Sequence, residues 1–107
     1  MNKRKEVVLY DIKRDNGDWL SLTVYYDGPI LTFFAHDFTE IHELMFGDEE
    51  YEGYHTFDEE NILKLKKLFN TDDLLNAISH YFNGEMKDDA FFKMCDKNNI
   101  KYKSYTV

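Results

Sequence analysis

One four-residue stretch, Asp15-Asn16-Gly17-Asp18, restricts the fold of this chain more than any other. Asn-Gly supplies the two residues with positive φ that a type I′ turn requires, and such turns join adjacent antiparallel strands. The residues before the turn alternate as strands do, with Val8, Tyr10 and Ile12 on one side. The stretch therefore predicts a β-hairpin, with its first strand in residues 7–12.

The strand after this turn has the clearest alternation in the sequence. In residues 19–26 (WLSLTVYY) one side is apolar, and the other side carries Trp19 and Tyr25. The side chains predicted to face inward are Leu20, Leu22, Val24 and Tyr26. Asp27-Gly28-Pro29 favours a second turn, and residues 30–35 favour a third strand. These segments predict an antiparallel meander with two aromatic side chains on its outer side.

Helical periodicity replaces alternation after the meander. Apolar residues recur at intervals of three and four and predict a short helix that Gly47 ends. These residues are Phe38, Ile41, Leu44 and Met45. Either Asp37 or Thr39 is the expected N-cap. Residues 51–57 (YEGYHTF) predict a fourth strand.

The C-terminal half predicts three more helices and a last strand. Thr56-Phe57-Asp58-Glu59 reads as a capping box with Thr56 as N-cap. Two further helices are expected up to Phe82 and over residues 87–97, before a strand at 100–107. We therefore predict a single α+β domain over residues 1–107. Its antiparallel sheet has four or five strands, with three or four helices packed on one face.

Negative charge is distributed unevenly along the chain. The net charge is −8, and Lys and Arg are absent from residues 15–63, which contain thirteen carboxylates. Binding to nucleic acid or to an anionic membrane requires clustered Lys and Arg, so neither is an expected partner. No apolar run reaches the ~18 residues that a membrane span needs. Cys95 has no second cysteine to pair with, which fits a reducing cytosol.

The stretch from His36 to Glu43 (HDFTEIHE) combines two histidines with three carboxylates. Zinc sites on a helix place two histidines four residues apart, whereas His36 and His42 are six apart. Helical geometry also scatters the carboxylates over more than one face. We therefore expect no metal, no cofactor and no catalytic residues, and the chain is predicted not to be an enzyme.

The acidic stretch is predicted instead to be a protein-binding surface. Residues 46–54 (FGDEEYEGY) contain three aromatic residues and four carboxylates. Aromatic side chains supply binding hot spots, and carboxylates accelerate encounter with a cationic protein. The residues expected to bind the partner are Asp37, Glu40, Glu43, Asp48, Glu49, Glu50, Tyr51, Glu52 and Tyr54.

Several short motifs resemble those of a family of small uncharacterised bacterial proteins. They are Trp19-Leu-x-Leu, Asp37, Glu43-Leu-Met-Phe-Gly-Asp48, Tyr51-Glu52-x-Tyr54, Thr56-Phe57-Asp58 and Ile100-x-Tyr102. More loosely, the chain resembles the acidic immunity proteins that accompany polymorphic and contact-dependent toxins. That resemblance implies a cytosolic inhibitor that covers a cationic toxin domain, and it carries over no catalytic residue.

Two alternatives remain open from the sequence. One is a structural or regulatory module that acts as a homo-oligomer, such as a homodimer, through Trp19 and Tyr25. The other is a metal-dependent enzyme. The leading expectation is an immunity protein that neutralises a cationic toxin through its acidic, tyrosine-rich surface.

Overall fold

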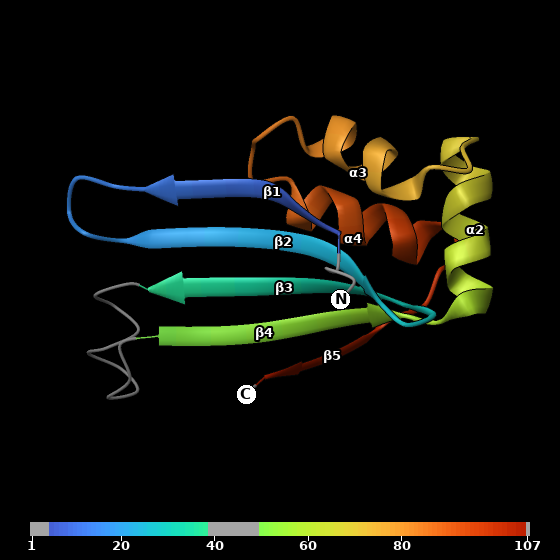
Figure 1. Ribbon diagram of the computed structural model, residues 1–107, viewed down its shortest axis with the longest axis horizontal. Helices are drawn as coiled ribbons and strands as arrows, with labels where there is room; N and C mark the ends of the chain where they lie inside the picture. Colours follow the sequence, from blue (N-terminus) through green and yellow to red (C-terminus); the bar gives the residue numbers. More distant parts are fainter. Residues whose placement is uncertain (1–4, 39–49, 107) are drawn as a thin grey trace.

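The computed structural model describes residues 5–38 and 50–106, and these form one antiparallel sheet with helices against it (Figure 1). The sheet has five strands in the order β1-β2-β3-β4-β5. The strands are β1 (Glu6–Lys13), β2 (Trp19–Asp27), β3 (Ile30–Phe38), β4 (Glu50–Phe57) and β5 (Lys103–Thr106). The helices are α2 (Glu59–Phe69), α3 (Leu74–Phe82) and α4 (Asp88–Lys97). The predicted α+β class and the N-terminal meander are confirmed.

The third strand is longer than the sequence indicated. β3 continues through His36 and Asp37 to Phe38, which pairs with Trp19 on one side and Glu50 on the other. Asp37 therefore lies inside a strand, so the first of the two expected N-caps is wrong, and the second, Thr39, lies outside the described residues. Pairing to strands on both sides outweighs the local helical period, which counts Phe38 as its first apolar residue. Residues 39–47 of that predicted helix lie outside the described residues.

A bulge in β1 changes which side chains the first strand buries. Val8 pairs with Thr23 and Tyr10 pairs with Leu22, so Leu9 is an extra residue between them. Both Leu9 and Tyr10 are buried, whereas Val8 is 60% exposed. The prediction that Val8 shares one side of the strand with Tyr10 and Ile12 is therefore wrong, because simple alternation does not hold across a bulge.

The first hairpin forms as predicted but with a different turn. The amide of Gly17 donates to the carbonyl of Arg14 at 3.0 Å, and the amide of Arg14 donates to the carbonyl of Asp18 at 2.8 Å. Gly17 has a φ of 93°, and Asn16 is not among the residues with positive φ. A type I′ turn needs positive φ at both positions, so this is the longer kind in which a single glycine forms a bulge.

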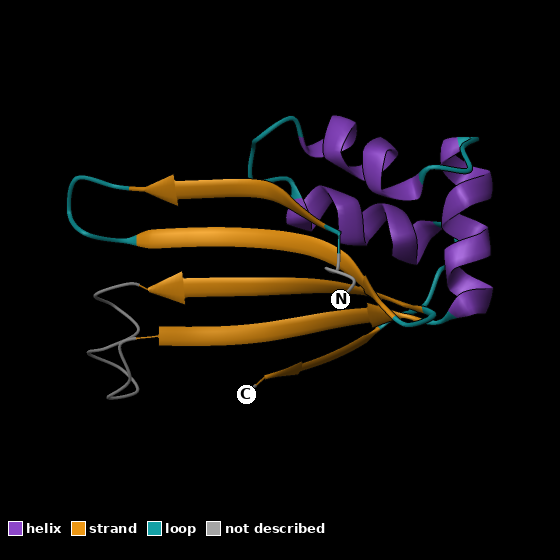
Figure 2. Ribbon diagram, viewed as in Figure 1, coloured by secondary structure: helices purple, strands orange, loops and turns teal. Residues whose placement is uncertain are grey.

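The helices cover one face of the sheet and bury an aromatic core (Figure 2). Phe33 and Phe57 from the sheet pack against Phe91 of α4, with ring centroids 5.2 and 6.4 Å away. All three rings are fully buried. Phe82 adds a further ring at 5.6 Å from Phe91. The core thus joins the central strands to the last two helices.

The cap of α2 differs from the predicted one by two residues. Asp58 is the N-cap, and its carboxylate accepts the backbone N–H of Asn61 at 3.1 Å. Thr56, the predicted cap, is still part of β4. Asp is as good a cap as Thr, and the sheet keeps Thr56 in its ladder.

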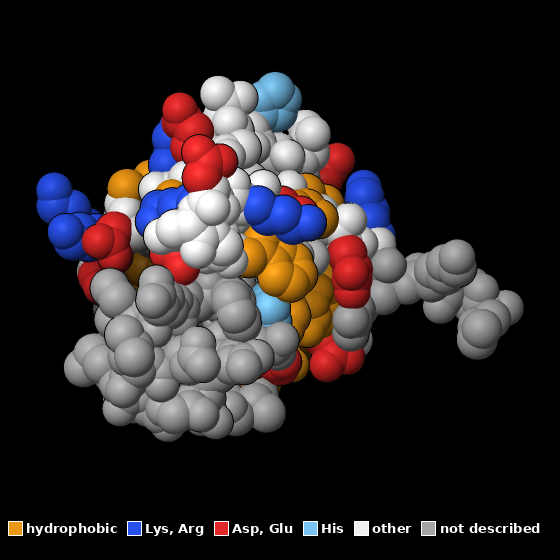
Figure 3. Space-filling model, turned by 90° about the vertical axis from the view of Figure 1, so that its left-hand side faces the viewer, with side chains coloured by type: hydrophobic (Ala, Val, Ile, Leu, Met, Phe, Trp, Pro, Cys, Tyr) orange, Lys and Arg blue, Asp and Glu red, His pale blue; other side chains and the backbone are white. Residues whose placement is uncertain are grey.

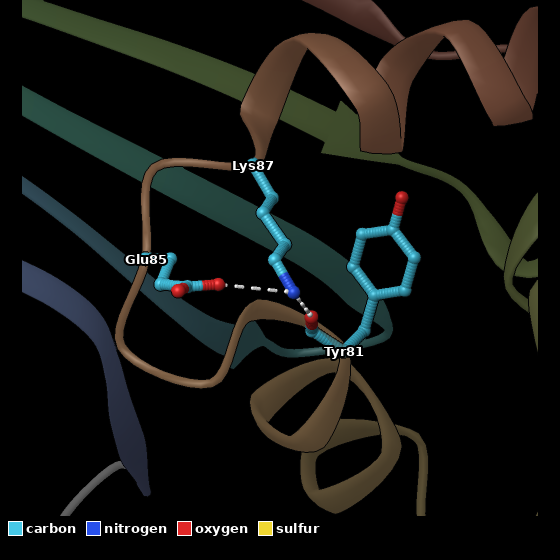
Figure 4. A network of polar contacts seen from close by, with 3 residues as sticks. All are labelled: Tyr81, Glu85 and Lys87. Carbon is cyan, nitrogen blue, oxygen red and sulfur yellow. Dashed lines mark hydrogen bonds and ion pairs between the residues drawn. The ribbon is translucent and has the colours of Figure 1, made fainter.

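One lysine closes the connection between α3 and α4 (Figure 4). The ammonium group of Lys87 donates to the carbonyl of Tyr81 at 3.1 Å and lies 3.2 Å from the carboxylate of Glu85. Asn83, just before this connection, ends α3 with a φ of 51°. Lys87 itself precedes α4, which begins one residue later than predicted.

The last strand is shorter than expected. β5 spans four residues, and Ile100, which was predicted to begin it, is a buried part of the core instead. Asn99 has a φ of 56°, as expected for a left-handed helix stop. Among the described residues, no helix has the length and apolar character needed to cross a membrane.

Candidate functional site

The sheet has one face against the helices and a second face that these helices do not cover. Because successive side chains of a strand point to opposite faces, the register assigns each residue to one of them. Leu20, Leu22 and Val24 of β2 are buried in the core and define the inner face. We call the opposite side, to which Trp19, Ser21 and the alternate residues paired with them belong, the outer face.

Aromatic side chains form a continuous line across the outer face. The aromatic row consists of Trp19, His36, Phe34, Tyr54 and Tyr105. Its consecutive ring centroids are separated by 4.7, 6.4, 5.0 and 5.1 Å, distances at which aromatic pairs attract. The row spans β2, β3, β4 and β5, and it ends at Tyr105, which is 53% exposed.

Two charged neighbours hold the first ring of the row in place. The indole N–H of Trp19 donates to the carboxylate of Asp11 on β1. The ammonium group of Lys13 lies 5.4 Å from the centre of the Trp19 ring, within the range of a cation–π contact. Trp19 is thus fixed in one orientation while part of its ring remains accessible, as a binding anchor requires.

A hollow of about 610 Å³ lies at the other end of the outer face. It is formed where the β2–β3 turn, the start of α2 and the segment before β5 come together. Its lining residues are Tyr25, Asp27, Ile30, Thr32, Tyr54, Thr56, Asp58, Glu60, Asn61, Lys101, Tyr102, Lys103 and Tyr105. Tyr25 and Thr32 are nearly fully buried and form its floor. Tyr54 and Tyr105 belong both to the hollow and to the aromatic row.

Asn61 joins the two chain segments that form one wall of the hollow. Its side-chain amide donates to Asp58 at 2.7 Å, and its side-chain carbonyl accepts the backbone N–H of Lys101 at 2.7 Å. Asn61 is 5% exposed, so its polar atoms depend on these partners. The start of α2 and the segment before β5 are therefore connected by one buried side chain.

Carboxylates outnumber ammonium groups around the hollow. Asp27, Asp58 and Glu60 face two lysines, Lys101 and Lys103. Hydrogen bonds from the backbone and side chain of Asn61 lower the pKa of Asp58, and Lys103 and Lys64 add to this effect. The Asp58 carboxylate is thus ionised at neutral pH.

At the end of the molecule that carries the β1–β2 turn, hydrophobic side chains also lie beside carboxylates (Figure 3).

The structure separates the predicted binding residues that it describes. Asp37 pairs with Leu20 and lies on the inner face, where its charge helps to raise the pKa of Tyr10. Glu52 pairs with His36 and, like Tyr54, lies on the outer face. Glu50 and Tyr51 are backbone members of β4. The remaining predicted residues, Glu40, Glu43, Asp48 and Glu49, lie outside the described residues.

The two aromatic residues of the alternative hypothesis occupy different positions on the outer face. Trp19 is half-buried in the aromatic row, whereas Tyr25 is 7% exposed and lines the hollow. Phe34, Tyr105 and Asn61 are the residues that sequence reasoning missed. Phe34 follows Phe33 in a strand, so alternation alone places one of the two rings on the outer face. No sequence signal indicates the buried role of Asn61.

A second polar group lies at the β4–β5 edge of the sheet. His55 Nδ1 and Ser104 Oγ are 2.6 Å apart, and the His55 ring packs 4.6 Å from that of Phe92. Burial lowers the pKa of His55, so its ring is neutral at pH 7 and could accept the hydroxyl proton of Ser104. Asp88 accepts the hydroxyl of Tyr10 at 2.7 Å, and no hydrogen bond joins it to His55 among the described residues. Within the described part of the chain, the pair therefore lacks the third group that orients the histidine of a catalytic triad.

A reactive thiol and a cluster of metal-binding side chains are two other kinds of site to consider. Burial raises the pKa of Cys95 to about 12, so the thiol stays protonated at neutral pH. Within residues 5–38 and 50–106, no group of three or more His, Cys, Asp or Glu side chains is arranged to hold a metal ion. The outer face, with its aromatic row and its hollow, is the best-formed candidate site.

The chain was compared with protein-family models, curated proteins and solved structures, and no match was found in any of the three comparisons.

Proposed function

We propose that this chain is a non-catalytic, protein-binding inhibitor that covers a cationic partner with its outer face. The single observation that carries this proposal is the aromatic row, because partly exposed aromatic side chains in a line on a rigid sheet are suited to be the hot spots of an interface. The helices give the sheet a packed inner face, so the outer face can present these rings without rearrangement.

The charge of the chain supports a cationic partner. A net charge of −8 accelerates association with a positively charged protein and repels nucleic acid. Glu52 lies beside the aromatic row, because it pairs with His36 and precedes Tyr54 by two residues. The predicted binding residues Glu52 and Tyr54 therefore remain in this proposal, whereas Asp37 faces the other side.

The most specific form of the proposal is an immunity protein that neutralises a cationic toxin in the cytosol. A toxin that cleaves nucleic acid carries a cationic active site, and an inhibitor that occupies that site needs carboxylates together with aromatic anchors. The free, buried thiol of Cys95 is in keeping with a reducing compartment.

The test is to co-express this chain with a candidate cationic toxin domain encoded by the adjacent gene. Wild-type protein should restore growth and bind the purified domain, whereas the double variant Trp19→Ala/Phe34→Ala should do neither. Leu63→Ala removes an apolar side chain that is 65% exposed on α2, and it should behave as wild type. Full protection by the double variant would contradict a role for the outer face.

Salt dependence gives a second readout of the same complex. Raising the salt from about 50 mM to about 500 mM should slow association sharply, because screening weakens the attraction between the two proteins. An association rate that does not change with salt would contradict electrostatic recognition of a cationic partner.

The second candidate function is homo-oligomerisation through the same face. Trp19 favours it, because it lies at the end of an aromatic row that the described helices do not cover, and two copies could bury their rows against each other. Light scattering after size-exclusion chromatography separates the two proposals. A stable dimer that Trp19→Ala converts to a monomer supports homo-oligomerisation and argues against the inhibitor.

A further inference from the structure

The hollow on the outer face combines two chemistries that together fit one kind of side chain. One wall carries the stacked rings of Tyr54 and Tyr105, and the end of β2 and the start of α2 contribute Asp27, Asp58 and Glu60. We propose that this hollow receives an arginine side chain of the cationic partner. This inference rests on the proposed function and names the chemical group that the outer face recognises.

The aromatic wall suits a planar cation. The Tyr54 and Tyr105 rings are 5.1 Å apart and only 18° from parallel, so they form a flat stack. Tyr54 packs against Phe34 on the other side, at 5.0 Å, while Tyr105 ends the row and is 53% exposed. A guanidinium group can pack against the exposed part of the Tyr105 ring, which combines a cation–π attraction with contact between flat surfaces.

The carboxylates supply the hydrogen-bond acceptors that a guanidinium group needs. Asp27 and Glu60 are exposed, and neither makes an ion pair or a hydrogen bond through its side chain with the residues described here. Asp58 is ionised and already oriented by Asn61. A guanidinium group can bind a carboxylate through two parallel N–H donors, which an ammonium group lacks the geometry to do.

The two lysines of the hollow do not make it an anion site. Lys103 lies close enough to Asp58 to contribute to the lowered pKa of that carboxyl, so part of its charge is already compensated. The hollow retains more carboxylates than ammonium groups, in a chain with a net charge of −8. Its volume of about 610 Å³ falls in the range of roughly 300–1,000 Å³ that is usual for ligand pockets.

The test uses small probes, so it does not require the partner. Full-length ¹⁵N-labelled protein is titrated with N-acetyl-arginine methylamide and followed by amide chemical shifts. The same titration is repeated with the citrulline analogue, which has nearly the same shape but no charge, and with N-acetyl-aspartate methylamide. The arginine probe should shift the amide resonances of Thr56, Lys103 and Tyr105. It should bind at least about fivefold more tightly than the citrulline probe, because citrulline cannot form the cation–π contact or the charged hydrogen bonds.

Matched variants locate the binding. Tyr105→Ala and Glu60→Gln should each weaken arginine binding at least about threefold, since the first removes the ring on which the guanidinium group stacks and the second removes one of the three carboxylates. Asp72→Asn removes an exposed carboxylate outside the hollow and should leave the affinity unchanged. The amide spectrum of each variant shows whether it is folded, and Glu60→Gln keeps the shape of the side chain.

Three results would overturn the inference. They are equal shifts with arginine and citrulline, shifts at these amides with the aspartate probe alone, and no shifts with any probe. In each case the proposed function is judged separately by the Trp19→Ala/Phe34→Ala variant. Loss of toxin neutralisation in that variant would still support the outer face as the interface, with recognition that does not depend on an arginine in the hollow.

Discussion

Both faces of the sheet are rich in aromatic side chains, but the two sets are packed in different ways. On the inner face Phe33 and Phe57 are fully buried against Phe91 of α4. On the outer face Trp19 and Phe34 are half-buried and contact mainly other rings of the sheet. One set holds helices onto strands, and the other set, within the described part of the chain, packs against neighbouring strands of the sheet.

This difference in packing predicts that the inner rings matter most for stability and the outer rings for binding. A ring enclosed on all sides leaves a cavity when it is removed, so its loss destabilises the fold. A ring that keeps part of its surface in water loses less on truncation, and that exposed surface is what a partner can bury. A chain with nine Phe and eight Tyr can supply both sets within 107 residues.

The largest effect on stability is expected on the inner face. Phe91→Ala should lower the free energy of unfolding by about 3–5 kcal/mol, because a fully buried ring leaves a cavity among the strands and helices. Urea denaturation followed by circular dichroism measures this loss. Tyr105→Ala at the exposed end of the row should lower the free energy of unfolding by less than about 1 kcal/mol. Similar losses for Phe91→Ala and Tyr105→Ala would contradict the difference between the two faces.

On the outer face, truncation of an aromatic side chain should affect binding more than stability. Phe34→Ala should weaken binding to the partner by about 2 kcal/mol or more, as hot-spot truncations do, while it destabilises the fold less than Phe91→Ala. Isothermal titration calorimetry gives the binding loss, and denaturation gives the stability. A variant that binds as tightly as wild type would remove the aromatic row from the interface.

Asn61 tests how the hollow is built. Asn61→Ala removes the acceptor of the Lys101 amide and the donor to Asp58, and should cost about 1–3 kcal/mol of unfolding free energy. The change in denaturation midpoint measures it. Asn76, which is exposed on α3, provides the control, because Asn76→Ala should have a much smaller effect. Equal effects would show that the buried bonds of Asn61 add nothing.

The smallest predicted effect is a pH dependence at the β4–β5 edge. Burial lowers the pKa of His55 in the folded chain below its ordinary value of 6.5. As the pH falls below about 6.5, the unfolded chain takes up this proton before the folded chain does, so stability should decrease until the pH reaches the folded pKa. His55→Gln should lose less stability between pH 7 and pH 5 than wild type, as measured by thermal unfolding. Identical pH profiles would contradict this assignment.

The sequence predicted the arrangement of strands well because the alternation and turns of the meander are local signals. Trp19 was placed on the outer side from the period of β2 alone, and the structure puts it there. The failures at Val8 and Asp37 have one cause. Pairing with a neighbouring strand decided the conformation there, through a bulge at Leu9 and through the extension of β3.

The candidate site was harder to predict because it is assembled across the sheet. The row brings Trp19, Phe34, Tyr54 and Tyr105 together from four strands, and only the register shows that their rings meet. The acidic stretch gave the charge of the expected partner, but counting carboxylates along the chain did not separate Asp37 on one face from Glu52 on the other. The net charge follows from composition alone, whereas the side chains that share a surface are determined by how the strands pair.

The most direct measurement uses the only tryptophan of the chain. Incorporation of 5-fluorotryptophan into this protein alone gives one ¹⁹F resonance, from Trp19 at the end of the aromatic row. Addition of the unlabelled cationic partner should shift this resonance. It should also reduce the change in its chemical shift when H2O is replaced by D2O, because the ring becomes buried at the interface. A partner that binds tightly by calorimetry while the ¹⁹F resonance stays unchanged would contradict the assignment of the outer face as the binding surface.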